Sequence, residues 1–77
     1  MEASNCSWLR DPPDGPLPCA VQVRYRAPEV PAVVTPLEGG RVRVDFDRPI
    51  RAVTPGQAAV FYDGDAVLGG GWIDRAG

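Results

Sequence analysis

Arginine is the only cationic side chain in this sequence, and six of the arginines fall where they could share one surface. The chain holds eight arginines but neither lysine nor histidine. Four of the six alternate with apolar residues along two expected strands, which places them on the polar sides of those strands. If the two strands lie near one another, they form a basic stripe that an adjoining loop extends. The stripe consists of Arg24, Arg26, Arg41, Arg43, Arg48 and Arg51.

Such a stripe predicts one of two surfaces. Guanidinium groups bind phosphate oxygens, so the first is a contact with an RNA backbone, with Tyr25, Trp8 or Trp72 available to stack on bases. The second is a mixed, solvated outer face on which acidic neighbours balance the arginines. Since the net charge of the chain is −2, overall charge does not favour nucleic acid, and any RNA contact must be a local patch.

The residue types that catalysis most often requires are scarce. Without histidine or lysine, the chain has no imidazole base and no Schiff-base amine. Its two serines, Ser4 and Ser7, lie near the N-terminus. We interpret Asp45 and Asp47 as part of a solvated strand face, and Asp63 as turn chemistry. No catalytic residue is predicted.

Cys6 and Cys19 are the two thiols. The sequence shows neither a signal-peptide pattern nor a run of about 18 apolar residues that could span a membrane. We therefore expect a cytoplasmic protein whose thiols are reduced and partly buried rather than joined in a disulfide. Two cysteines without histidine cannot complete the four ligands of structural zinc, so no metal site is predicted.

Alternating apolar and polar residues indicate short strands with turn residues between them. The alternation is clearest where Val42, Val44 and Phe46 face one way. Because closure removes strand edges that a 77-residue chain could scarcely cover, the pattern predicts an all-β fold, a small antiparallel β-barrel of about five to six short strands. The expected strands are residues 17–26, 32–37, 41–47, 58–62 and 67–68.

We expect a single barrel domain over residues 17–74, a leader and proline-rich loop over residues 1–16, and a tail over residues 75–77. Residues 1–7 show no apolar period, and the prolines that follow them exclude a helix or a central strand. Pro36 interrupts the run at residues 32–37, which predicts that this strand lies at an edge.

The most specific stretch is residues 52–73. Its Pro-Gly pair fits the central positions of a type II turn, and its Asp-Gly pair those of a type I′ hairpin turn. A glycine triplet ends the last strand and would allow a sharp bend or the close approach of another backbone. It is not a phosphate-binding loop, because the Gly-x-x-x-x-Gly-Lys pattern is absent. These signature residues are Pro55, Gly56, Asp63, Gly64, Gly69, Gly70 and Gly71.

Three motifs in this stretch stand out: Ala-Val-Thr-Pro-Gly-Gln from residue 52, Val-Phe-Tyr-Asp-Gly from residue 60 and Leu-Gly-Gly-Gly from residue 68. Together with shorter matches upstream, they resemble the C-terminal signature of the bacterial tRNA-specific 2-thiouridylases. The resemblance runs from about Trp8 to Ile73. It implies a β-barrel similar to those of translation factors and aminomethyltransferases.

The resemblance also implies a role. In that family the whole enzyme adenylates the wobble uridine of tRNA with ATP and replaces the 2-oxygen with sulfur delivered as a cysteine persulfide. This barrel would support that reaction by packing on the catalytic domain and helping to hold the tRNA. The family's Ser-Gly-Gly-x-Asp-Ser loop for ATP is absent here, so no cofactor is expected in this chain. For the same reason, neither Cys6 nor Cys19 is assigned the sulfur-transfer role.

A second hypothesis is a free-standing small barrel that acts as a protein-interaction or assembly module. Its contact surface would be Trp8, Trp72 and the apolar edges. The two hypotheses differ in salt dependence, because phosphate contacts weaken steeply as salt rises whereas apolar docking does not.

Overall fold

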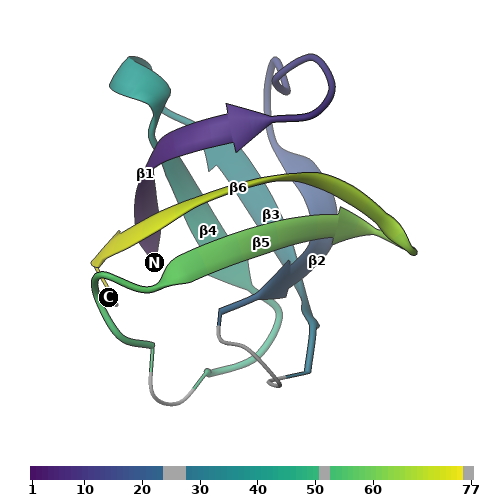
Figure 1. Ribbon diagram of the computed structural model, residues 1–77. Helices are drawn as coiled ribbons and strands as arrows, with labels where there is room; N and C mark the ends of the chain where they lie inside the picture. Colours follow the sequence, from purple (N-terminus) through teal and green to yellow (C-terminus); the bar gives the residue numbers. More distant parts are fainter. Residues whose placement is uncertain (24–27, 51–52, 76–77) are drawn as a thin grey trace.

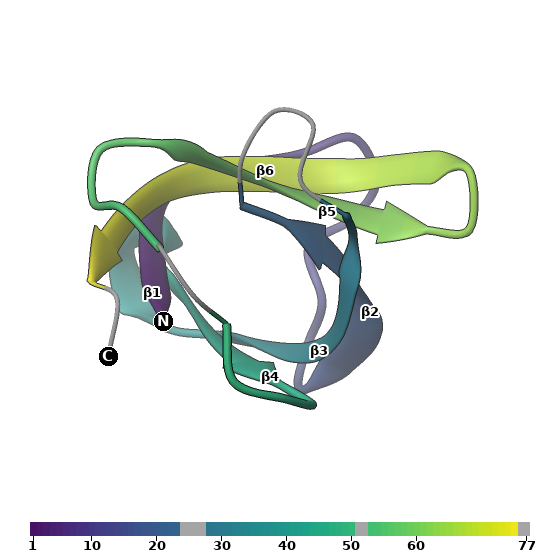
Figure 2. The ribbon, with the colours of Figure 1, turned by 90° about the horizontal axis from the view of Figure 1, so that it is seen from below.

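The computed structural model describes residues 1–23, 28–50 and 53–75. Within them the backbone forms six strands that close into one antiparallel barrel (Figure 1). Around the barrel the order is β1, β4, β3, β2, β5, β6, and Figure 2 shows the strands encircling the interior. The predicted all-β barrel is thereby confirmed. The strands are β1 (Glu2–Trp8), β2 (Leu17–Gln22), β3 (Val30–Pro36), β4 (Val42–Phe46), β5 (Ala58–Asp63) and β6 (Ala66–Arg75), and a 3₁₀ turn, η1 (Glu38–Gly40), joins β3 to β4.

The first strand corrects the expected domain boundaries. β1 occupies the segment predicted to be a leader, and it joins β6 to β4. Ala3 is fully buried, and Met1 exchanges two backbone hydrogen bonds with Val44, at N···O distances of 2.7 and 3.1 Å. The barrel therefore begins at Glu2 and not at residue 17.

A β-bulge hides this strand from the alternating pattern of apolar residues. The register between β1 and β6 shifts between Ser4 and Ser7, and Asn5 adopts a φ of 50°. Ala3 and Cys6 both pack against the core, but they are three residues apart in sequence. In a regular strand, residues on the same face are two apart. A period of two therefore does not detect β1.

Small aliphatic side chains fill most of the interior. Val42 and Val44 of β4 are each only 1% exposed, as the alternation of that segment predicts. Phe61 is the largest side chain with no exposed surface, and the ring of Trp8 packs against it at a centroid distance of 5.4 Å. The buried core consists of Ala3, Val21, Val23, Val30, Ala32, Val34, Val42, Val44, Ala59, Phe61, Leu68 and Ile73.

β3 lies between β2 and β4, so the prediction that this strand forms an edge is wrong. Its two prolines, Pro31 and Pro36, are the second and the last residue of the strand. At the ends of a strand a missing N–H removes little of the hydrogen-bond ladder. The carbonyl of Pro31 still accepts a hydrogen bond from the backbone N–H of Asp47, at 3.0 Å.

The turn before β5 has the predicted type II geometry. Gly56 adopts a φ of 90°, and the backbone N–H of Gln57 donates to the carbonyl of Thr54 at 3.3 Å. Only glycine accepts such a φ at the third turn position without strain.

The hairpin between β5 and β6 turns one residue later than predicted. Asp63 pairs with Ala66, so the two loop residues are Gly64 and Asp65. Gly64 has a φ of 60° and Asp65 does not share the positive value. Glycine at the first loop position is the pattern of a type II′ turn rather than type I′, and it suits the strand twist equally well.

Candidate nucleic-acid interface

The structure places three of the six predicted arginines. Arg24, Arg26 and Arg51 lie outside the described residues. Arg41 directly precedes β4, Arg43 lies within it, and Arg48 follows it in the loop toward β5; all three are exposed. β4 thus presents its arginines to solvent and its valines to the core, which is the orientation that the sequence predicts.

Arg41 and Arg43 both have acidic partners. Arg41 Nη1 lies 3.4 Å from Glu2 Oε1, and Arg41 Nε donates to the carbonyl of Glu38 at 3.2 Å. Arg43 Nε lies 3.1 Å from Asp45 Oδ2, and both side chains are more than half exposed. Ion pairs this exposed contribute little to stability and are screened by salt. The pairs therefore leave the guanidinium groups available to a phosphate that competes with the carboxylates.

The face around β4 is mixed in charge. Glu2, Glu38, Asp45 and Asp47 lie beside or between its arginines in sequence and in the paired strands. β3 separates β4 from β2, and the predicted arginines that follow β2 in sequence lie outside the described residues, so the extent of the stripe beyond β4 stays a prediction. This arrangement is compatible with both surfaces that the sequence predicts, the RNA contact and the solvated mixed face.

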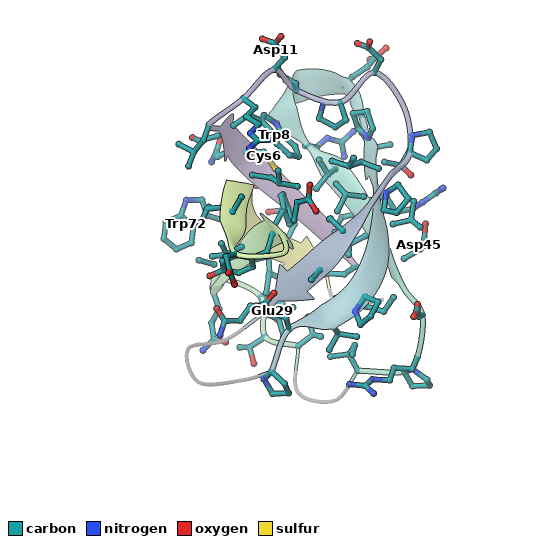
Figure 3. All side chains as sticks on the ribbon, turned by 90° about the vertical axis from the view of Figure 1, so that its right-hand side faces the viewer. Cys6, Trp8, Asp11, Glu29, Asp45 and Trp72 are labelled. Carbon is teal, nitrogen blue, oxygen red and sulfur yellow. The ribbon has the colours of Figure 1, made fainter. Side chains whose placement is uncertain are left out.

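The two tryptophans have different environments. Trp8 is partly buried and packs on Phe61, so less of its ring is accessible for stacking than the sequence predicts. Trp72 of β6 is 53% exposed. Figure 3 shows Trp72 and Asp45 on opposite sides of the barrel. Trp72 therefore does not extend the arginine surface of β4, which sequence spacing alone could not reveal.

The thiols are protected rather than activated. Cys6 and Cys19 are free and half-buried. Burial, and to a smaller extent the nearby Asp74, raises the pKa of the Cys6 thiol. Burial and Asp63 raise the pKa of Cys19 in the same way. A raised pKa lowers the thiolate fraction, so neither side chain resembles an activated nucleophile.

Neither a metal centre nor a membrane-spanning helix is found among the described residues. In this part of the chain, no three His, Cys, Asp or Glu side chains gather closely enough to hold a metal ion. No helix that is long and apolar enough to span a bilayer occurs within residues 1–23, 28–50 and 53–75.

Comparisons with known proteins match nearly the whole chain. The family described as "Aminomethyltransferase beta-barrel domain" matches residues 1–73. The tRNA-specific 2-thiouridylase MnmA of Geobacillus thermodenitrificans is 49% identical over 97% of this chain, and that of a Synechococcus strain is 60% identical over 94%. The MnmA protein of Yersinia pestis is 50% identical over 97% of the chain.

These matches cover only a small part of each relative. The chain spans only 20% of the length of each of these three relatives. The match confirms the resemblance to the 2-thiouridylases and includes β1, since the family region starts at residue 1. The fold and the extent of the match together show that this chain belongs to the aminomethyltransferase β-barrel domain family, in the form found in tRNA-specific 2-thiouridylases.

Proposed function

We propose that this chain is the accessory barrel of a tRNA 2-thiolation enzyme, and that it packs on the catalytic domain and helps to hold tRNA. The observation that carries the proposal is the identity of 49–60% with 2-thiouridylases over at least 94% of the chain. The catalytic steps, including the use of ATP, would belong to the remaining four-fifths of such an enzyme. We expect no turnover from this chain alone, and a cytoplasmic location, where tRNA is modified.

The arginine face of β4 is the surface that we assign to tRNA. Arg41, Arg43 and Arg48 are exposed, and they lie within β4 or just before and after it. The exposed ion pairs of Arg41 and Arg43 can be exchanged for phosphate contacts, which would position the RNA without reading its sequence. The acidic neighbours reduce the attraction, so binding by the isolated barrel would be weak and strongly salt-dependent.

The test is a titration of the 77-residue chain with an unmodified tRNA that carries a wobble uridine, repeated over a salt series. The variant is R41A/R43A, and the matched control is R10A, which removes an exposed arginine from the loop after β1. We expect R41A/R43A to lower the salt slope of the association constant by about 0.9 for each phosphate that the variant no longer neutralises. R10A should keep the slope of the parent chain.

Two results would contradict this assignment. One is the absence of saturable binding at low salt while thermal melting shows the barrel intact. The other is a weakening of binding in R10A that is half or more of that in R41A/R43A. R10A removes one charge and the double variant removes two, so that result would show a response to net charge rather than to the β4 face.

The alternative function is a protein-interaction module. The half-exposed indole of Trp72 favours it, because tryptophan is enriched at the centres of protein interfaces. Salt-insensitive binding of a protein partner, together with no tRNA binding, would support this alternative over the first proposal.

A further inference from the structure

The outer side of the β5–β6 hairpin has a patch without charged side chains, which we call the Trp72 face. It borders a shallow groove of about 250 Å³. Trp72 lines this groove and is 53% exposed. The face consists of Asn5, Ser7, Ala58, Val60, Gly70, Gly71 and Trp72.

The neighbours of Trp72 make its indole ring protrude. Trp72 pairs with Ala58 on β5 and with Ser4 on β1, and both carry small side chains. Gly70, which pairs with Val60 and Ser7, has no side chain at all. The indole ring therefore projects beyond the small residues around it. Such a ring fits into a complementary apolar pocket of a partner, where it is removed from water.

The Trp72 face and the arginine face lie on different sides of the barrel. Around the closed barrel, β5 lies three strands from β4 in either direction, and β6, which carries Trp72, lies two strands from β4 with β1 between them. Figure 3 shows the same separation, with Trp72 on one side of the molecule and Asp45 of β4 on the other. One surface can therefore be covered while the other remains free for a substrate.

We infer that the Trp72 face is the surface by which the barrel docks on the catalytic part of a 2-thiouridylase-type enzyme, against an uncharged, apolar surface of that part; the inference rests on the proposed function. The relatives are about five times as long as this chain, so their remaining sequence is available to cover the face. The centres of protein interfaces lack charge and are enriched in aromatic side chains, as this face is. RNA is the poorer occupant, because single-strand stacking sites combine aromatic rings with cationic side chains, and none of the residues that line this groove is cationic.

The experiment is hydroxyl-radical footprinting of Trp72 in two proteins. One is the 77-residue chain; the other is the Geobacillus relative with its matching fifth replaced by this chain. We expect the oxidation of Trp72 to fall severalfold in the fusion, without tRNA present. Leu9 is 73% exposed and lies outside the face, so its oxidation should be unchanged and serves as the internal control.

A second measurement uses W72R with L9R as the matched control. Both positions are exposed, so both variants of the 77-residue chain should melt near the parent temperature. Because W72R lacks the indole, protection is read in this variant from the oxidation of Val60, which lines the same groove. In the fusion, W72R should weaken that protection by roughly 30-fold in the docking equilibrium, and L9R should leave it unchanged.

The outcomes separate the two proposals. A fusion that thiolates tRNA while Trp72 stays fully oxidisable overturns the docking inference and leaves the proposed function standing. Protection of Trp72 only after tRNA is added also overturns the inference, since it assigns the face to RNA. A fusion that neither thiolates tRNA nor protects Trp72 overturns both.

Discussion

The glycine triplet of β6 offers the sharpest test of how this barrel closes. Gly70 lies opposite β5, and a Cβ added there would be 2.6 Å from the carbonyl oxygen of Ala59. Gly71 lies against β1, and a Cβ there would be 2.9 Å from the carbonyl oxygen of Ser4. At Gly71 the Sγ of the Cys6 side chain lies closer still, at 2.6 Å, whereas at Gly70 the nearest obstructing atoms all belong to the backbone of β5. The most informative substitution is therefore Gly70→Ala.

The expected cost follows from this geometry. A carbon and a carbonyl oxygen in contact are normally about 3.3 Å apart, so the strands would have to separate by roughly 0.7 Å. Overpacking of this kind costs about 1–3 kcal/mol, and alanine returns about 0.4–1 kcal/mol by restricting the unfolded chain. The free energy of unfolding should fall by about 1–2 kcal/mol, which is a large share of a total of roughly 4–12 kcal/mol for a chain of this length.

Thermal melting followed by circular dichroism is the assay. For a domain of this size, a loss of about 1–2 kcal/mol lowers the melting temperature by roughly 4–16 °C. The matched control is Gly15→Ala in the loop after β1, because an added Cβ there meets no atom within 4 Å. That variant should be unchanged or slightly more stable. If Gly70→Ala melts at or above the temperature of Gly15→Ala, the close approach of β5 and β6 is refuted.

Two further predictions concern β1 and the thiols. Deletion of residues 1–8 should open the barrel along β4 and β6 and expose Ile73 and Val42. We therefore expect the shortened chain to elute as oligomers in size-exclusion chromatography and to lose cooperative melting. A monomer that still melts cooperatively would contradict the role of β1. Burial raises the pKa of Cys6 and of Cys19 in the folded state, so these thiols ionise at a lower pH in the unfolded chain. Their contribution to the free energy of unfolding is therefore fully present below the ordinary thiol pKa and decreases as the pH rises above it. Urea unfolding between about pH 8 and pH 10 should show this decline, C6A/C19A should reduce it, and an equal decline in that variant would assign the effect to other groups.

Local sequence determined the class of this fold. Alternation in β4 specified which residues face the core, and Val42, Val44 and Arg43 lie where it predicts. Proline and glycine determined the turn before β5, because few residues accept a φ of 90°. Such features depend on neighbours within a few residues, so a single sequence contains them. The motifs of residues 52–73 likewise sufficed to indicate the family.

Tertiary structure alone decided how the elements meet. The bulge at Asn5 hides β1 from any period of two, and only its pairing with β4 and β6 shows that it closes the barrel. Glu2 thereby reaches Arg41, 39 residues away in sequence, and gives the arginine face its mixed charge. The different exposure of Trp8 and Trp72 also depends on strand order, since one ring faces Phe61 and the other faces outward. Contacts between residues far apart in the chain depend on the closure of the whole sheet, and no local pattern of residue types encodes that closure.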